Sequence, residues 1–267
     1  MNRLTVLIPC KNERNDIRAC LESVQSVADE VLIADSGSTD DTLDIVRDIG
    51  GCRIIQREFV NSGSFKNWAI PQAEHEWVLV VDADERLSQE LQAEIRELVV
   101  SGPQHDGYRL RRRNYFMGHV VRYGPWGTDK LLRLFRKDVS RYEGENDHAD
   151  VAVSTRNVGC LKNRLDHYTC WTYDQYVRKQ ERYVSYQAML WHKSGKRPSL
   201  PKLYLTSVFR FLHIFVLRGG FLDGVVGLQV ARLVSYYSYQ KQARLWQLHC
   251  GKLPFDHEPE KSTRTAA

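Results

Sequence analysis

At 267 residues, the chain is long enough for one large domain or for one domain with an appended segment, since domains typically hold roughly 100–200 residues. Hydrophobic residues make up 42% and charged residues 27% of the chain, which excludes an intrinsically disordered protein. The net charge of +5 is unevenly distributed: between Gln175 and Lys252, thirteen Lys and Arg residues stand against Glu181 and Asp223, so this segment carries +11 and the rest −6. Such an asymmetry predicts a polyanionic partner for the basic segment.

The cysteines and the N-terminus favour a protein of the reducing cytoplasm. The six cysteines have neither a metal-cluster spacing nor the pattern of a small disulfide-rich scaffold. The first apolar run, Leu4–Cys10, contains Pro9 and is followed at once by Lys11, so no signal peptide is expected.

The N-terminal part of the chain alternates strand signals with helix signals. Apolar runs predict strands at Leu4–Pro9 and Glu30–Ala34, and a weaker run predicts one at Arg53–Ile55. Helical spacing predicts three helices: Ile17, Leu21 and Val24 behind Asn15 as N-cap, Leu43 and Val46 behind Ser38 or Thr39, and Leu91, Ile95 and Leu98 behind Ser88. This order is typical of an α/β domain with a parallel sheet.

The most informative segment is a further strand, Trp77–Val81, that runs directly into Asp82-Ala83-Asp84-Glu85. In open α/β sheets, ligands bind beyond the carboxyl ends of the strands. Asp82 and Asp84 are two positions apart, so an extended chain directs them to the same side, where they share a divalent cation and its phosphates. The segment predicts a nucleotide-diphosphate site; the alternative is an ordinary turn with a solvated Asp.

The second half of the chain changes character. Strands are predicted at Tyr108–Arg111 and Leu131–Arg136, and the Gly- and aromatic-rich loop between them, Tyr115–Gly127, has the length of functional loops. After His167 the chain is predicted to be helical, basic and aromatic. The predicted organisation is an α/β domain at 1–173, a helical basic region associated with a membrane or acceptor at 174–252, and a disordered tail at 253–267.

The segment Leu203–Trp246 is the most apolar part of the chain. Charged residues divide it into uncharged runs of no more than eight residues, which is too short for a spanning helix of about 20 apolar residues. Cations interleaved with Phe, Tyr and Trp are typical of helices that lie in the headgroup plane of an anionic membrane. Packing of the same aromatics within a helical subdomain is the alternative, and the two are compatible.

Four motifs occur in an order that resembles the inverting family 2 glycosyltransferases, most closely their lipopolysaccharide-core β-1,4-glucosyltransferase group. They are Ile8–Glu13, Ala34–Thr42, Lys66–Ala69 and Asp82–Glu85. Further matches lie at Arg112–Gly118, Leu131–Arg136, His167–Thr169 and Arg218–Gly224, in collinear order, and the similarity extends to about Trp246. The resemblance implies a GT-A type fold: a nucleotide-binding α/β domain with a mostly parallel central sheet.

The resemblance also implies roles for individual residues. Asp35 would accept a hydrogen bond from the uracil ring, as an ionised carboxylate does from an N–H group. Asp82 would face the ribose, and Asp84, with Asp82, the Mg²⁺ or Mn²⁺ ion that stabilises the departing diphosphate. The nucleotide pocket would also be bordered by Pro9 and Glu13, with Lys66 near the diphosphate. From the residues alone, Asp35 is a turn or N-cap group and Lys66 a solvated helix residue.

The resemblance places the base that deprotonates the acceptor in residues 143–151, where the glucosyltransferase group usually has Gly-x-x-His-Glu or a Glu-Asp pair. We expect Asp150 in this role, with Asp147 second, although Ala149 stands where an acid is common. An acidic surface loop without a catalytic part is the alternative. His148 and His167 have no Cys/His cluster beside them, so hydrogen-bonded structural roles are expected for both. Trp126 either stacks on a sugar or fills the core.

These expectations combine into a metal-dependent inverting transferase. It would move a hexose, glucose in the first instance, from a UDP-sugar to a lipid-linked glycan such as lipopolysaccharide core, at the cytoplasmic face of the cell membrane. A polyprenyl-phosphate or exopolysaccharide intermediate is an alternative acceptor, and a non-catalytic sugar-nucleotide-binding scaffold is suggested by Ala149. A dinucleotide-binding oxidoreductase is disfavoured because no G-x-G-x-x-G follows the first strand. No recognised nucleic-acid module is present, so a nucleic-acid partner is not expected.

Overall fold

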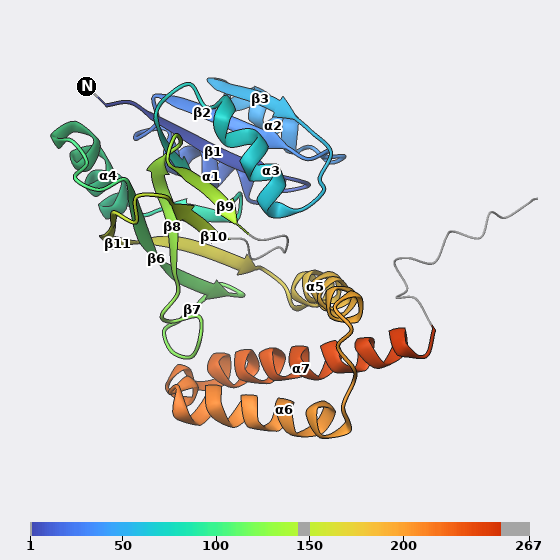
Figure 1. Cartoon of the computed structure of the whole chain (residues 1–267). Helices are drawn as coiled ribbons and strands as arrows, with labels where there is room; N and C mark the ends of the chain where they lie inside the picture. Colours follow the sequence, from blue (N-terminus) through green and yellow to red (C-terminus); the bar gives the residue numbers. More distant parts are fainter. Residues whose placement is uncertain (1, 144–149, 252–267) are drawn as a thin grey trace, which may run out of the picture. The chain divides into compact units, whose positions relative to one another are not determined.

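The computed structural model describes residues 2–143 and 150–251, which form two compact units (Figure 1). The first, here called the sheet unit, comprises Met1–Tyr115 and Trp126–Thr169. The second, the helical unit, comprises Phe116–Pro125 and, among the described residues, 170–251. The predicted tail at 253–267 lies outside the described residues, as does Asp147.

The sheet unit is built on a central sheet with the strand order β3-β2-β1-β4-β8-β6-β11-β5. The first four strands along this order are parallel, and β8 joins them antiparallel through β4. Their bounds are β1 Leu4–Cys10, β2 Glu30–Asp35, β3 Cys52–Gln56, β4 Trp77–Val80, β5 Glu85–Leu87, β6 Gly107–Phe116, β8 Lys130–Arg136 and β11 Val158–Cys170. The strands predicted in the N-terminal part are therefore confirmed to within two residues, and the α/β prediction is confirmed.

Helices connect the parallel strands: α1 Ile17–Val24, α2 Thr42–Ile49, α3 Ser62–Ala69 followed by a 3₁₀ turn at Ile70–Gln72, and α4 Gln89–Ser101. The cap predicted for α4 is confirmed, because the Ser88 side chain accepts from Leu91 N at 3.3 Å. The cap predicted for α2 is wrong. The helix begins behind Asp41, since the hydroxyl of Ser38 is engaged in the preceding turn, where it donates to Asp35. Helix α1 begins behind Asp16, one residue after the predicted Asn15.

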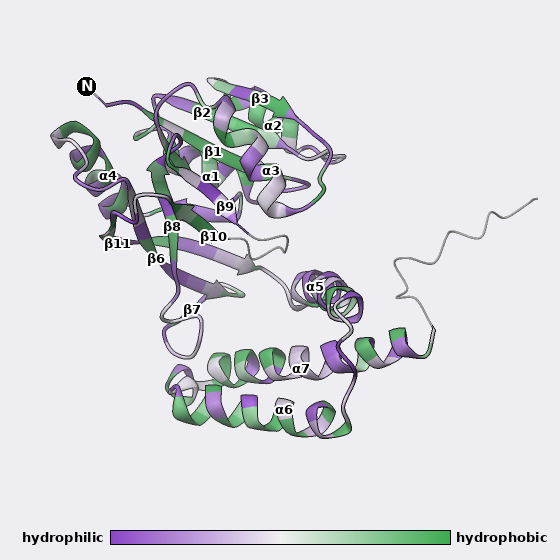
Figure 2. Cartoon of the chain, in the orientation of Figure 1, coloured by the Kyte–Doolittle hydropathy of each residue, from purple (hydrophilic) through white to green (hydrophobic). Residues whose placement is uncertain are grey.

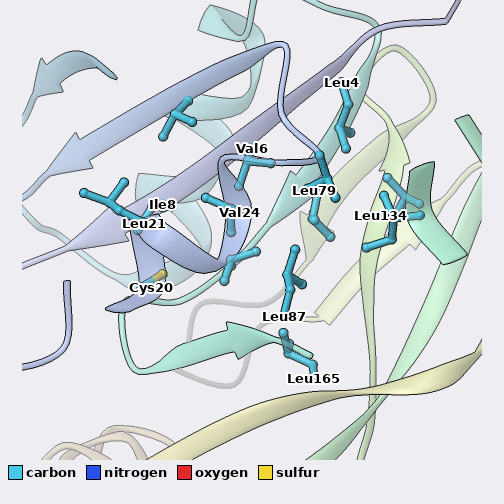
Figure 3. Packing of buried hydrophobic residues seen from close by; sticks show 14 of the residues in the cluster. Leu4, Val6, Ile8, Cys20, Leu21, Val24, Leu79, Leu87, Leu134 and Leu165 are labelled. Carbon is cyan, nitrogen blue, oxygen red and sulfur yellow. The ribbon is translucent and has the colours of Figure 1, made fainter. Parts of the chain in front are cut away.

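The core explains why the parallel strands are continuously apolar. Leu4, Val6 and Ile8 alternate along one face of β1 and pack with Leu21 and Leu79 (Figure 3), whereas Leu7 belongs to a second cluster on the other face. A strand buried on both faces has no polar side to expose. The core therefore holds the ends of β1, β2 and β4 on a rigid support.

The helical unit contains the short strand β7 His119–Val121 and three long helices, α5 Tyr173–Lys193, α6 Leu200–Leu212 and α7 Gly224–His249. Helix α6 continues as a π-helical turn at His213–Leu217, and a 3₁₀ turn at Gly220–Asp223 leads into α7, so α6 and α7 form a hairpin (Figure 1). The expectation of helix directly after His167 is wrong by a few residues: β11 runs to Cys170, and the Thr172 capping box starts α5.

Helix α6 has no buried residue in its span, and Figure 2 shows hydrophobic residues along it. By length and composition, the stretch Leu200–Leu217 is apolar enough to cross a membrane, and only 6% of it is buried. This stretch was not predicted from the sequence, where only the length of uncharged runs was considered. Its mean hydropathy over 18 residues is high even though it contains Lys202 and Arg210.

Candidate active site

The carboxyl ends of β1, β2 and β4 meet at one edge of the sheet. The register pairs Cys10 with Asp35, and Val81 N donates to Leu7 O at 3.0 Å. The segments that follow these strands therefore share one rim, as expected for parallel strands. Predicted site residues lie on all three segments.

Asp35 is fully buried at the end of β2. Its carboxylate accepts from the Ser38 hydroxyl at 2.6 Å, from Gly37 N at 3.1 Å and from Gln56 Nε2 at 3.0 Å. Burial opposes its charge, but the hydrogen bonds from Ser38, Gln56 and Gly37 outweigh burial, so the pKa of Asp35 lies below its ordinary value. Asp35 is thus an ionised turn residue, and its role toward uracil stays a prediction.

Pro9 and Glu13 flank the loop after β1. Pro9 is half-buried and pairs in register with Ala34, next to Asp35. The backbone N of Glu13 donates to Thr42 Oγ1 at 2.8 Å, and its carbonyl oxygen accepts from the first residues of α1. The loop after β1 is therefore tied to the start of α2, which fixes one border of the rim.

Asp82 lies between two cations. Lys66 Nζ donates to Oδ1 at 3.0 Å, and Arg133 pairs with Oδ2. Burial opposes the charge of Asp82, but Arg133 and Lys66 outweigh burial, so the pKa of Asp82 lies far below its ordinary value. Lys66 is 9% exposed and stacks over the ring of Tyr142, so the solvated-helix interpretation of Lys66 is wrong. Burial alone would lower its pKa, but Asp82 raises it above the usual range.

Glu85 stabilises the acidic turn, residues 82–85, from inside the core. It is fully buried, and its carboxylate accepts from Asp82 N at 3.0 Å, from Arg133 at 2.9 Å and from Arg112 at 3.2 Å. Arg112 also pairs with Asp129. Arg112 and Arg133 thus form ion pairs with carboxylates inside the sheet unit. A sequence signal existed: Arg133 interrupts the otherwise apolar Leu131–Phe135.

Asp84 lies next to His167, which belongs to β11 and is distant in the sequence. Asp84 Oδ2 lies 3.4 Å from His167 Nε2, and the Asp84 carbonyl accepts from Tyr168 N at 2.9 Å. His167 Nδ1 lies 2.6 Å from Asn114 Oδ1, and the amide of Asn114 is oriented by donation to Trp126 O at 2.7 Å. The contact with the Asn114 amide oxygen orients the imidazole so that Nε2 faces Asp84.

This pair fits a divalent cation. A carboxylate oxygen and an imidazole nitrogen are both ligands for Mn²⁺, and a second hydrogen bond on the histidine is the usual support of such a ligand. Within residues 2–143 and 150–251, no group of three or more His, Cys, Asp and Glu residues forms a ready-made cage. The two residues would therefore hold the ion together with non-protein ligands such as phosphate oxygens and water.

The predicted base lies on a separate hairpin, β9 Ser140–Glu143 with β10 Asp150–Val153. Asp150 is exposed and opens β10, opposite Glu143. The hairpin is fastened to α3: Asn67 Nδ2 donates to Tyr142 O and Tyr142 N donates to Asn67 Oδ1, both at 2.9 Å. Its loop, which contains Asp147, His148 and Ala149, is outside the described residues.

The sequence profile described as glycosyl transferase family 2 matches residues 5–150, and the chain belongs to this family. It is 30% identical to the lipopolysaccharide core biosynthesis glycosyltransferase LpsC of Rhizobium meliloti over 254 residues, covering 93% of this chain and 94% of that relative. It is 28% identical to an uncharacterized glycosyltransferase of Rickettsia typhi, covering 93% of this chain and 88% of the relative. The family resemblance drawn from the motifs is thereby confirmed.

Among solved structures, the glucosyl-3-phosphoglycerate synthase of Mycobacterium tuberculosis in complex with phosphoglyceric acid resembles the chain with a TM-score of 0.51. The alignment covers 74% of this chain and 82% of that one, at 14% identity. At this identity the likeness concerns the fold alone. The chain has the GT-A type fold predicted for it and is a glycosyltransferase homologous to a lipopolysaccharide core enzyme.

Proposed function

We propose that the protein transfers a hexose, glucose in the first instance, from a UDP-sugar to a lipid-linked glycan such as lipopolysaccharide core, with inversion at the anomeric carbon. The observation that carries the proposal is the acidic turn after β4, where Asp84 lies beside His167 and Asp82 lies between Lys66 and Arg133. Similarity to LpsC over nearly the whole chain supports the choice of acceptor.

The donor site is assigned to the strand-end rim. Asp35 accepts from the uracil N–H, and Pro9 and Glu13 border the base. Asp82, kept ionised by its two cations, accepts from the ribose hydroxyls. Lys66 lies within hydrogen-bonding distance of Asp82 and supplies positive charge near the diphosphate. The buried Arg133 and the partly buried Arg112 hold this rim in place before any ligand binds.

The cation site is assigned to Asp84 and His167, with Asp82 facing the same ligand. When bound, Mg²⁺ or Mn²⁺ supplies Lewis-acid stabilisation of the charge on the leaving diphosphate. Asn114 orients the imidazole, so Asn114 and Trp126 act through His167. This assignment extends the sequence prediction, in which His167 was expected to have a structural role.

The acceptor hydroxyl is deprotonated by Asp150 or, second, by Asp147. Asp150 is exposed at the start of β10, and the anchoring of β9 on α3 gives its hairpin a fixed base. A carboxylate performs this step when it lies within hydrogen-bonding distance of the hydroxyl. A polyprenyl-phosphate or exopolysaccharide acceptor would use the same residues.

We place the protein in the cytoplasm, on the inner face of the cell membrane, because a lipid-linked acceptor is found there together with cytoplasmic UDP-sugars. The excess of +11 between Gln175 and Lys252 supports peripheral contact with anionic lipid.

The test is release of UDP from UDP-glucose with a lipopolysaccharide-core acceptor, with and without chelator. We expect Asp84→Asn to lower the rate by on the order of a hundredfold or more, since one electrostatic group at a transition state contributes that much. We also expect it to remove the metal-dependent thermal stabilisation by UDP. The matched control is Asp44→Asn, an exposed acid in α2. UDP binding without turnover in the unaltered protein would instead support the non-catalytic scaffold.

A further inference from the structure

One surface of the helical unit is not explained by sugar transfer. Helix α6 and the π-helical turn that continues it expose large apolar side chains, including six that are between 49% and 71% accessible. Here called the outer face, they are Tyr204, Leu205, Val208, Phe209, Leu212 and Val216. At 100° per residue these positions occupy one continuous sector of the helix. An exposed apolar sector of this kind marks an interaction surface.

Eight further positions of α6 and its π-helical turn fall into two more sectors. Leu203, Ser207, Phe211 and Ile214 recur at helical spacing and are the less exposed positions, as expected for the side that packs on α7. Lys202, Thr206, Arg210 and His213 form a polar sector on the other side of the outer face. The outer face therefore has a cationic border along its length.

Helix α7 adds two cations that contact aromatic rings of the helical unit. Arg232 lies over the ring of Phe211 at 5.0 Å, and Lys241 lies over the rings of Trp191 and Tyr237 at 5.3 and 4.3 Å. Burial, with Arg210 and Lys196 nearby, lowers the pKa of Lys241 to about 8.

In the described part of this segment, neither Asp223 nor Glu181 forms an ion pair with Lys202 or Arg210. Asp223 accepts from the backbone N of Arg122 and Tyr123, and Glu181 pairs with Arg244. Among the described residues, the border therefore has no acidic ion-pair partner at Lys202 or Arg210. Its charge is complementary to anionic headgroups, and the outer face is complementary to acyl chains.

The fold argues against α6 crossing the bilayer. A spanning Leu200–Leu217 would place Arg210 near the bilayer centre, which is unfavourable. At the turn of the hairpin, Asp223 fastens the chain to Arg122 and Tyr123, and at the other end α7 packs on α5. The 116–125 segment and α5 both continue directly into strands of the sheet unit, so both ends of α6 belong on the aqueous side.

We propose that the outer face of α6 is a monotopic membrane-docking surface, which lies parallel to an anionic bilayer with its apolar side chains at the acyl boundary and Lys202 and Arg210 among the phosphates. The partner is the lipid surface itself. The inference rests on the proposed function only in that a lipid-linked acceptor makes such a surface useful to the enzyme.

The test is co-sedimentation of the full-length protein with phosphatidylcholine vesicles that contain or lack phosphatidylglycerol. We expect binding to the anionic vesicles and release by salt. Leu205→Glu should weaken partitioning at least about tenfold, because a buried apolar side chain contributes that much. Lys202→Glu with Arg210→Glu should weaken it about fivefold for each cation lost, and more steeply at low salt.

Matched controls come from the sheet unit. Val100 and Leu205 are both 66% exposed, so Val100→Glu adds the same charge at an equally accessible apolar position. Arg3→Glu with Arg109→Glu repeats the charge reversal at exposed arginines. Both controls should leave vesicle binding unchanged, and far-ultraviolet circular dichroism should show that all variants are folded.

Three results would overturn the proposal. The first is equal loss of binding in Leu205→Glu and Val100→Glu. The second is resistance of bound protein to both salt and alkaline carbonate, which would mean that α6 crosses the bilayer. The third is a dimer in light scattering that Leu205→Glu dissociates, without vesicle binding, which would assign the face to a second copy. Vesicle binding needs no turnover, and transfer to a lipid-free core acceptor is measured separately, so failure of the proposed function is distinguished from failure of this inference.

Discussion

Arg133→Met tests whether the acidic turn is supported by buried charge. Arg133 is 4% exposed and Glu85 is fully buried, so the substitution leaves the Glu85 carboxylate in the core with Arg112 as its remaining cationic partner at 3.2 Å. Breaking one side of a buried ion pair costs about 3–5 kcal/mol. For a domain of this size, that corresponds to a fall in Tm on the order of 10 °C.

The measurement is urea unfolding followed by tryptophan fluorescence, in chelator so that bound metal does not contribute. Arg136→Met is the control on the same strand. Arg136 pairs with Glu76, Asp106 and Asp138, but its side chain is 34% accessible, so its loss should cost no more than about 1 kcal/mol.

A second substitution separates charge from packing. Glu85→Gln removes the buried carboxylate charge that Arg133→Met leaves without its partner. The double variant Arg133→Met with Glu85→Gln should therefore be at least about 1 kcal/mol more stable than the sum of the two single effects predicts. Additivity within about 0.5 kcal/mol, or an Arg133→Met cost no larger than that of Arg136→Met, would refute the argument.

Two further predictions concern other parts of the chain. Burial opposes the charge of Glu30, but hydrogen bonds from Thr5, Glu74 N and Arg53 lower its pKa. Glu30 therefore stabilises the fold above the ordinary carboxyl pKa of about 4, and this stability is lost as the pH falls below that value. Glu30→Gln should flatten the plot of unfolding free energy against pH in that range, whereas Glu22→Gln, which changes an exposed acid of α1, should not. A Cβ on Gly227 would collide with the carbonyl oxygen of Gly220, so Gly227→Ala should open the α6–α7 hairpin and increase its cleavage in limited proteolysis. The control Ala243→Gly in the same helix should lower the unfolding free energy by only about 1 kcal/mol. Equal protease resistance of Gly227→Ala and the unaltered protein would contradict the close approach.

Much of the fold was predictable because burial of a strand or helix face requires a local pattern of apolar residues in the sequence. The sequences of β1, β2 and β4 are continuously apolar since both faces of these strands are covered. Ser88 predicts the start of α4 because an N-cap needs a short polar side chain. The bounds and cap of helix α3 were not predicted, since Gly63 and two serines interrupt its apolar spacing and no regular apolar run follows its cap, Asn61. The start of α2 was misplaced because Ser38 serves the Asp35 turn.

The site was predictable only as far as it is local. Asp82 and Asp84 are adjacent to a recognisable strand, so their place at the sheet rim followed from the sequence. His167 and Arg133 come from strands far along the chain, and only the sheet order brings them to the acidic turn. Without knowledge of that order, an isolated His or Arg carries no sign of its partner.

The two neighbours Lys66 and Asn67 have a consequence for engineering. The first holds Asp82, and the second holds the β9–β10 hairpin through Tyr142. A chimera that exchanges the hairpin between relatives to alter which glycan is extended should therefore carry α3 with it. If α3 is not exchanged as well, the imported hairpin faces an Asn67 that did not evolve with it, and the mismatch lies one residue from Lys66 in the proposed donor site.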